Sequence, residues 1–431
     1  MKVKYLIIGN SAGGIGAAEA IRQAGDSGSI LIISEEPYPA YSRPLISEYL
    51  ADGCSLERIL FRPVDFYERN GIQTILGAKV EQLDVDEHLV RLGDGRVIAW
   101  EKLLLATGGV PIVPPMGGAD RPGVFTFTTL DDAKAIGRSL NGSERAVVIG
   151  GGLIGVSVAE ALVKRGVGVS VVEMKERILN TILDETASAL AADALGRAGV
   201  DIITGHTVAE IVGDSARGAA SGVTLDDGSG LAADLVIVAI GVRPRTEMVA
   251  DNGIQMNRGI AVSRRMATSQ PDVYACGDVA EAYDFVYGDN RLTPIWPNAY
   301  LGGRVAGFNM AGIPAEYPGG TAMNALKYFG LSIVSAGVVN CLDNGYEVLA
   351  ETDGSTYRKV VLQNGVLVGM VFTGDIEKAG IVLSLMQDRI NTDGFKQVFI
   401  GVDFGLASLP EEVWRTRLEA SPSGLDSSAV S

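Results

Sequence analysis

The chain repeats one short pattern at two places, and this repeat constrains its fold more than any other feature. The first copy is residues 5–14 and the second is residues 146–155. Each copy reads as a short apolar strand, a tight glycine turn and the start of a helix. Such a turn lets the backbone approach a pyrophosphate and directs helix N–H groups at it. Two copies predict two bound dinucleotides, and two dinucleotides held side by side predict hydride transfer between them.

The two turns differ in how closely they match the glycine fingerprint G-x-G-x-x-G. In the first turn, Ser11 replaces the middle glycine, and a residue this small still permits close approach of the backbone. The second turn has all three glycines. The residues that we expect to contact a dinucleotide at the two turns are Gly9, Ser11, Ala12, Gly14, Gly150, Gly152, Leu153, Ile154 and Gly155.

A carboxylate ends the second strand of each copy. Glu35 and Glu173 stand where a carboxylate accepts hydrogen bonds from the ribose hydroxyls of a dinucleotide. In the second copy, Glu173 favours the free 2′-hydroxyl of NAD and repels the 2′-phosphate of NADP. Lys175 and Arg177 follow closely and reduce the weight of this inference. We therefore expect NADH as the second dinucleotide, with NADPH less favoured.

Length and charge narrow the class of protein. A chain of 431 residues predicts two or three domains. With 36 basic and 52 acidic residues its formal charge is −16, which disfavours binding to nucleic acid or anionic lipid. No apolar run approaches the roughly 20 residues that a bilayer requires, and the N-terminus enters its first strand without the apolar region of a signal peptide. We expect a cytoplasmic protein with no membrane span and no nucleic-acid partner.

Cysteine and histidine are scarce and unpaired in sequence. The three cysteines are Cys54, Cys276 and Cys341, and none belongs to a CxxC-like pair. The two histidines, His88 and His206, lie in no recognisable ligand motif. Disulfide frameworks, zinc sites and iron–sulfur sites need closely spaced ligands. We therefore expect no metal site and no catalytic histidine in this chain.

The order of apolar segments predicts an α/β fold. Strands alternate with helical stretches through the first 240 residues, which is typical of parallel sheets. The expected strands are residues 4–8, 29–34, 103–106, 169–172 and 235–241, together with one that begins near residue 145, and the expected helices are 13–25 and 153–165. From about residue 316, turn signals such as Gln363-Asn364-Gly365 predict hairpins. The predicted fold is thus two doubly wound, three-layer α/β domains followed by a small α+β domain.

Further motifs carry a resemblance to a known superfamily. They are Ala106-Thr107-Gly108, Ala239-Ile240-Gly241-Val242-Arg243-Pro244 and Val273-Tyr274-Ala275-Cys276-Gly277-Asp278. With the two turns, they make residues 4–400 resemble the FAD-dependent pyridine nucleotide–disulfide oxidoreductase superfamily. Residues 34–44, 321–330 and 368–369 are similar to a narrower group. That group includes NAD(P)H–rubredoxin reductases, ferredoxin-reductase components of oxygenases, apoptosis-inducing factor and the flavin part of nitrite reductases.

The resemblance implies which cofactor each domain binds. Residues 1–112 and 243–315 would form a discontinuous, Rossmann-like FAD-binding domain, and residues 113–242 a Rossmann-like NAD-binding domain. Residues 316–420 would form the α+β domain, which serves as an interface in such relatives, and residues 421–431 a disordered tail. A homodimer, or a place in a complex through the α+β domain, follows as an expectation.

The resemblance also implies contacts to FAD. Gly277 and Asp278 would meet its ribityl and phosphate region, with Asp278 hydrogen-bonded to a ribityl hydroxyl. The helix near Ala299 would point its N-terminus at the flavin pyrimidine ring and stabilise the anionic reduced flavin. Arg43 would contact the adenine or the phosphates, and the backbone of Val80 would touch the adenine. The remaining expected contacts in the family motifs are Thr107, Gly108 and Gly241.

The chain departs from its apparent relatives in two respects. Disulfide reductases of the superfamily carry a redox cysteine pair, and its peroxidases and water-forming oxidases carry one reactive cysteine near position 43. This chain has neither, and we interpret Cys54 as an idle thiol and Cys276 as a packing residue. Ferredoxin-reductase-like members also place a Lys–Glu pair beside flavin N5. Here Glu48 and Ser157 stand at those positions, so flavin potential and oxygen reactivity cannot be carried over.

These inferences lead to one principal function and two alternatives. Hydride transfer from NADH to flavin needs positioning more than acid–base groups, so we assign no catalytic side chain. Without a redox cysteine, electrons must leave the flavin directly. The principal hypothesis is transfer to a protein acceptor: a rubredoxin- or ferredoxin-like carrier, or an iron–sulfur subunit of a larger complex that could run toward NAD reduction. The alternatives are an NADH oxidase that reduces oxygen and a redox-responsive interaction protein that binds NADH.

Overall fold

The computed structural model describes residues 1–214, 218–341, 344–401 and 403–419. The tail expected to be disordered, residues 421–431, lies outside this range. The chain separates into two compact units. The first unit comprises Met1–Asn180 and Ala191–Ala322, and the second comprises Thr181–Leu190 and the chain from Met323 onward. Both glycine turns fall in the first unit, and the finer three-domain division stays a prediction.

The first large sheet of the first unit contains the N-terminal strand. Its strand order is β3-β2-β1-β6-β5-β4, and β18 also pairs with β6. The bounds are β1 (Lys2–Ile8), β2 (Ile30–Ser34), β3 (Ile72–Leu76), β4 (Val80–Asp84), β5 (Leu89–Leu92), β6 (Val97–Leu105) and β18 (Val273–Ala275). Strands β3, β2, β1, β6 and β18 are parallel, as their buried apolar runs predict, whereas β4 and β5 form an antiparallel hairpin.

The second large sheet of the first unit carries the second glycine turn. Its order is β11-β10-β9-β15-β8, and all of its neighbouring strands are parallel. The bounds are β8 (Val124–Thr126), β9 (Arg145–Ile149), β10 (Gly168–Glu173), β11 (Val200–Thr204) and β15 (Leu235–Val238). A separate three-stranded sheet follows β11 in the chain: β12 (Val208–Gly213), β13 (Ala220–Leu225) and β14 (Gly230–Ala232).

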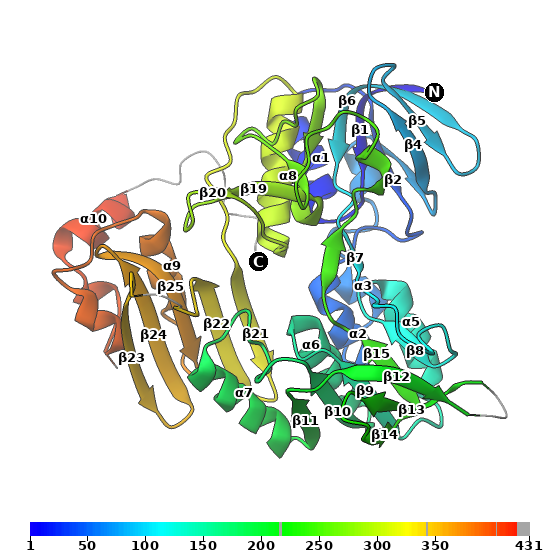
Figure 1. Ribbon diagram of the computed structural model, residues 1–431. Helices are drawn as coiled ribbons and strands as arrows, with labels where there is room; N and C mark the ends of the chain where they lie inside the picture. The colour runs from blue at the N-terminus through cyan, green and yellow to red at the C-terminus, as the bar shows by residue number, and fades with distance from the viewer. Residues whose placement is uncertain (215–217, 342–343, 402, 420–431) are drawn as a thin grey trace. The chain divides into compact units, whose positions relative to one another are not determined.

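A short two-stranded ribbon joins the regions of the two large sheets (Figure 1). Strand β7 (Gly109–Pro111) leaves the first sheet, and β16 (Val242–Pro244) returns to it. The two strands pair antiparallel, with Arg243 opposite Val110. Both chain crossings that the sequence predicted near residues 112 and 243 therefore run side by side.

Two helices of the first unit, α1 (Ala12–Gln23) and α8 (Trp296–Met310), pack against each other (Figure 1). The contact is between backbones: a Cβ atom placed on Gly303 would lie 2.0 Å from the carbonyl oxygen of Gly13. Only glycine fits there. The other helices of this unit with four or more residues are α2 (Ile46–Leu50), α3 (Leu56–Ile59), α4 (Phe66–Arg69), α5 (Leu130–Ser139), α6 (Leu153–Lys164) and α7 (Glu185–Arg197), although α7 begins in the segment grouped with the second unit. The remaining sheet contains β17 (Ile260–Ala261), β19 (Ala280–Asp284) and β20 (Asp289–Leu292).

The second unit is built on an antiparallel sheet of order β21-β22-β25-β24-β23. Its strands are β21 (Met323–Tyr328), β22 (Leu331–Gly337), β23 (Glu347–Asp353), β24 (Thr356–Gln363) and β25 (Val366–Thr373), followed by α9 (Ala379–Gln387) and α10 (Glu411–Glu419). The predicted hairpin turn is confirmed: Asn364 and Gly365 join β24 to β25 with φ of 52° and 76°. Two left-handed residues in a two-residue loop are the signature of a type I′ turn.

A buried ion pair holds a short segment of the second unit to its sheet. Lys359 Nζ donates to Asp184 Oδ2 at 2.8 Å and to the carbonyl of Val339 at 2.9 Å, and the Tyr357 hydroxyl donates to the same Asp184 oxygen at 2.6 Å. These partners lower the pKa of Asp184 although burial opposes the charge.

Among the described helices, none has the length and apolarity that crossing a bilayer demands.

Candidate dinucleotide sites

The first glycine turn lies where β1, β2 and β6 end. Gly9 has φ of 123°, and its N–H donates to the carbonyl of Ile33 at 2.9 Å. A Cβ on Gly9 would lie 2.1 Å from the carbonyl oxygen of Ala106, and one on Gly14 would lie 2.0 Å from the carbonyl oxygen of Gly9. Both glycines are therefore required for the strand to turn tightly into α1. The turn places the N-terminus of α1, with Ser11 and Ala12, at the edge of the sheet.

The second turn repeats this construction at the end of β9. Gly150 has φ of 108°, and a Cβ on it would lie 2.5 Å from the carbonyl oxygen of Ala239. A Cβ on Gly155 would lie 1.9 Å from the carbonyl oxygen of Gly150. Gly152 differs, because within the described structure a Cβ there meets no atom within 4 Å. Its backbone, followed by Leu153 and Ile154 in the first turn of α6, thus borders open space of the kind a pyrophosphate needs.

Glu173 is already engaged with the loop beside the second turn. Its Oε2 accepts the Gly151 N–H at 2.7 Å, and its Oε1 accepts the Lys175 N–H at 2.8 Å. The residue is 8% exposed. A carboxylate has about four acceptor positions, so two bonds leave capacity for ribose hydroxyls. Glu173 therefore both shapes the turn and remains able to take the predicted role.

Glu35 has a different partner. It forms an ion pair with Arg245, which follows β16. Arg245 is held in turn by backbone bonds: its N–H donates to the carbonyl of Gly108 at 2.9 Å, and its carbonyl accepts the Thr107 hydroxyl at 2.9 Å. The structure thus brings Glu35, Thr107 and Gly108 together through one arginine. The sequence reasoning missed Arg245, because nothing local marks it as the partner of a carboxylate 210 residues away.

Arg43 lies in a polar cluster with Glu36 and Tyr41. It pairs with Glu36 and donates to the carbonyl of Thr128 at 2.8 Å. The Tyr41 hydroxyl donates to the other Glu36 oxygen at 2.5 Å. Burial by itself would lower the pKa of Arg43, but Tyr41 and Glu36 outweigh it and the pKa is raised. The guanidinium is therefore a fixed positive charge, suited to phosphate.

Asp278 follows β18 at the start of a short 3₁₀ turn, residues Gly277–Val279. Burial raises its pKa, while the positive charge of Arg43 acts in the opposite direction. Next to it, Cys276 is 1% exposed, and its sulfur lies 2.6 Å from where a Cβ on Gly13 would be. Burial raises the pKa of the Cys276 thiol to about 12. Cys276 is thus a neutral packing residue, as expected.

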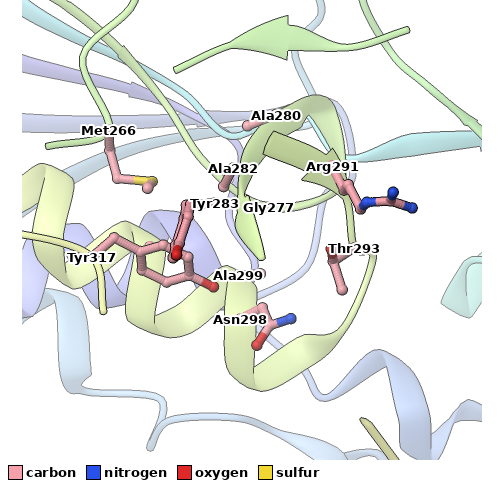
Figure 2. Close-up of a pocket in the computed structure, with 11 residues that line it drawn as sticks. Met266, Gly277, Ala280, Ala282, Tyr283, Arg291, Thr293, Asn298, Ala299 and Tyr317 are labelled. Atoms are coloured by element: carbon pink, nitrogen blue, oxygen red, sulfur yellow. The ribbon is translucent and has the colours of Figure 1, made fainter. Parts of the chain in front are cut away.

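The N-terminal turn of α8 lies beside Gly277. A Cβ on Gly277 would be 3.3 Å from the Cβ of Ala299, and the Ala299 N–H donates to the carbonyl of Ile295 at 3.0 Å. Between this turn and strands β19 and β20 there is a small pocket, part of it open to solvent. Figure 2 shows residues that line it, among them Asn298 from the first turn of α8, Arg291 from β20, and Tyr317, which follows α8 in the chain.

The other expected site residues are placed as follows. Val80 is buried at the start of β4 in the first sheet, opposite Leu92. Gly241 has φ of 120°, and its carbonyl accepts the Ile112 N–H at 2.9 Å beside the β7–β16 ribbon. Glu48 is exposed on α2. Separately, in the described part of the chain no group of three His, Cys, Asp or Glu residues could hold a metal ion.

The residues present fit two dinucleotides. Each turn offers a helix N-terminus, glycines where backbone packs on backbone, and a carboxylate at the end of the adjacent strand. Arg43 adds a fixed cation and Asp278 a buried acceptor on the first-turn side. These features match the phosphates, ribose hydroxyls and ribityl hydroxyls that FAD and NADH present.

The comparisons with known proteins agree with this geometry. Residues 3–303 match the model of the family described as pyridine nucleotide–disulphide oxidoreductase. The chain belongs to this family. It is an FAD-dependent oxidoreductase that uses a pyridine nucleotide. Residues 323–390 match a second model, described as the rubredoxin NAD⁺ reductase C-terminal domain.

Individual relatives differ in length. The chain is 33% identical over 419 residues to the NADH-dependent phenylglyoxylate dehydrogenase subunit epsilon of Aromatoleum evansii, covering 96% of this chain and 98% of that one. It is 34% identical over 403 residues to the nitrite reductase [NAD(P)H] of Bacillus subtilis, covering 93% of this chain but 49% of that protein. Among solved structures, the putidaredoxin reductase in its covalent complex with putidaredoxin matches with a TM-score of 0.86 and 26% identity, over 97% of this chain and 99% of that one.

Proposed function

We propose that this protein takes hydride from NADH onto FAD and passes the electrons to an iron–sulfur protein. The acceptor would be a small carrier of the rubredoxin or ferredoxin kind, or a partner subunit of a larger oxidoreductase. The observation that carries the proposal is the pair of matched glycine turns within one compact unit, each with its own carboxylate. Two dinucleotides held in one unit serve hydride transfer, and the acceptor then takes electrons from the flavin.

The cysteines support transfer to an external acceptor. Burial raises the pKa of the Cys54 thiol, and the nearby charge of Glu48 raises it further. Cys276 is buried with a pKa of about 12. The thiolate is the reactive form of cysteine, and both groups are neutral thiols at physiological pH. Neither is prepared to relay electrons between the flavin and a substrate.

The side chains of this protein would bind and orient rather than exchange protons. When bound, FAD supplies the group that accepts hydride and gives up electrons. Glu35 and Glu173 would accept ribose hydroxyls, and Asp278 would accept a ribityl hydroxyl. Arg43 would lie against the adenine or phosphates of FAD, and Gly152 would lie against the pyrophosphate of NADH. Because positioning accounts for this chemistry, we assign no proton-transfer residue.

The relatives support an iron–sulfur or other protein acceptor. One is a subunit of a larger dehydrogenase, another is about twice the length of this chain, and a third was crystallised with its redox partner. The C-terminal domain, which we assign to residues 316–420, would supply the contact to a second copy or to a complex. The proposed location is the cytoplasm, which cell fractionation would test.

The decisive experiment compares two rates on the FAD-loaded protein. Anaerobic stopped-flow gives the rate of flavin reduction by NADH, and an aerobic assay gives NADH consumption with oxygen alone. We expect fast flavin reduction by NADH and slow turnover in air. Turnover should recover when a rubredoxin or ferredoxin is added, with cytochrome c as the final electron acceptor. NADPH serves as the matched control and should reduce the flavin more slowly.

Other outcomes select the alternatives. Fast turnover in air would identify an NADH oxidase and contradict the protein acceptor. Slow reduction, followed by a stable long-wavelength absorption band and a change in oligomeric state, would instead identify a redox-responsive interaction protein.

A further inference from the structure

The two helices α1 and α8 begin side by side and run in the same direction. A Cβ on Gly16 would lie 2.5 Å from the carbonyl oxygen of Tyr300, and one on Gly13 would lie 3.4 Å from that of Ala299. One turn further along α8, Gly303 lies against Gly13 in the same way. The first turns of both helices are thus in direct backbone contact, and both N-termini lie at one edge of the first sheet.

A contact made of glycine backbone lets two helices approach closely. It does little to fix the position of one helix along the other. Helix register is normally set by side chains that fit into grooves of the partner. Here backbone meets backbone along the glycines of α1, and the α8 side chains that face Gly16 are those of Tyr300 and Arg304, so few side chains interlock across the contact. The position of the first turn of α8 must therefore depend on contacts beside the glycine surface.

Two side-chain bonds cross from α8 to α1 beside this surface. The Tyr300 hydroxyl donates to Glu19 Oε2 at 2.7 Å, and Arg304 Nη2 donates to Gln23 Oε1 at 2.6 Å. The Arg304–Gln23 bond lies one turn beyond the Tyr300–Glu19 bond along both helices. Together they form a two-rung connection parallel to the helix axes.

The rung nearer the N-terminus of α8 is the stronger one. The Glu19 carboxylate also receives two bonds from Arg62, at 2.5 Å from Nε and 3.2 Å from Nη2. The side chains of Arg62 and Glu19 are only 19% and 20% exposed, whereas the Arg304–Gln23 bond is at the surface. Hydrogen bonds to an ionised carboxylate are about twice as strong as neutral ones.

We propose that the Tyr300–Glu19 bond, anchored by Arg62, fixes the first turn of α8 and thereby sets the reduction potential of the flavin. The inference rests on the proposed function and on the family resemblance, which implies that this helix N-terminus points at the flavin pyrimidine ring. The positive end of a helix stabilises a nearby negative charge, and the effect falls off within one turn. Reduction makes that ring anionic. A small displacement of the turn would therefore weaken the stabilisation of reduced flavin.

The test is Tyr300→Phe in the full-length, FAD-loaded protein, because it removes one hydroxyl and no charge. The flavin is equilibrated with a redox dye of known potential, and the ratio of reduced to oxidised flavin is read from spectra. We expect a threefold to tenfold lower ratio, where tenfold corresponds to about 30 mV for a two-electron couple. FAD retention, measured by fluorescence of released flavin, should stay within about threefold, roughly 0.7 kcal/mol.

Two matched variants separate positioning from general loosening of the fold. Tyr5→Phe removes a similar bond, from the hydroxyl to Asp26 Oδ2 at 2.8 Å, whose carboxylate also keeps a cation, Lys4. It should lower the melting temperature and leave the potential unchanged. Gln23→Ala removes the surface rung and should shift the potential less than Tyr300→Phe does.

Each result supports or overturns the inference. An unchanged potential in Tyr300→Phe overturns it, as does an equal shift in Tyr5→Phe. Loss of FAD from Tyr300→Phe also overturns it, since the bond would then hold the fold together rather than tune the flavin. If NADH fails to reduce the flavin of the unmodified protein, the proposed function itself is wrong, whatever the variant shows.

Discussion

The two glycine turns are nearly identical in backbone, yet their carboxylates are held in different ways. Glu173 is buried and accepts backbone N–H bonds from Gly151 in the turn and from Lys175 just after β10. Glu35 is about half exposed and pairs with Arg245 from a distant part of the chain. The second turn is therefore complete within a single α/β unit, whereas the first becomes complete only when the chain returns through β16.

One fingerprint can therefore serve two kinds of binding, that of an exchanging cosubstrate and that of a retained cofactor. A locally closed site remains intact while a cosubstrate enters and leaves. A site completed by a distant arginine depends on the whole first unit, which suits a cofactor that stays bound. The predictions below test this contrast.

The largest effect is expected from Gly152→Glu. A side chain at Gly152 would enter open space next to the turn, and its charge would repel the pyrophosphate of NADH. Flavin reduction at fixed NADH should slow at least about 100-fold, roughly 2.7 kcal/mol, with FAD still bound. Gly196→Glu is the control, because it adds the same charge at an exposed helical glycine with open space around it. Loss of FAD with NADH reduction preserved would mean that the two sites are assigned in reverse.

The next effect separates the two carboxylates. Glu173→Ala leaves the Gly151 and Lys175 N–H groups without their acceptor, which should cost roughly 2–3 kcal/mol of unfolding free energy. Glu35→Ala removes a half-exposed ion pair and should cost less than about 1 kcal/mol, yet weaken FAD retention about tenfold, near 1.4 kcal/mol. Denaturant unfolding of the apoprotein and flavin release measure the two quantities. Equal stability losses would remove the contrast between a locally closed and a remotely closed site.

A smaller effect concerns Asp278 and pH. Because burial raises its pKa, the ionised carboxylate costs folding stability at neutral pH, and this cost disappears as pH falls through the raised pKa toward the ordinary value of 3.8. Asp278→Asn should therefore stabilise the apoprotein at neutral pH, with the gain over the natural protein shrinking toward pH 4. The same variant should retain FAD less well. A gain that grows as pH falls would contradict the raised pKa.

The smallest effect is expected from Cys54→Ser. The thiol is neutral, so its replacement should leave anaerobic flavin reduction and acceptor turnover within about twofold, roughly 0.4 kcal/mol. A large loss of turnover with reduction intact would show that Cys54 relays electrons after all.

The geometry of the two turns could be predicted because its signals are local. Positive φ at Gly9 and Gly150 and the strand–turn–helix order are written in a few consecutive residues. The Asn364-Gly365 turn is of the same kind, since only residues tolerant of the left-handed region suit it. The family motifs then identified the segments that accompany the turns.

The rest could not be predicted because it depends on which distant groups meet. Arg245 pairs with Glu35 across 210 residues of the chain, and Tyr300 bonds Glu19 across 281. Charged and aromatic side chains are common on surfaces, so their sequence gives no sign of a specific partner. The hairpin β4–β5 was also missed, because its short strands mix exposed polar and buried apolar residues without a clean period.

The β7–β16 ribbon has a mechanical consequence. Both covalent connections between the two dinucleotide regions pass through it, and its paired hydrogen bonds resist one strand sliding past the other. A narrow two-stranded ribbon of this kind can bend, but its strands do not slide past each other. Any movement between the two regions is therefore expected to bend this ribbon while β7 and β16 keep their register.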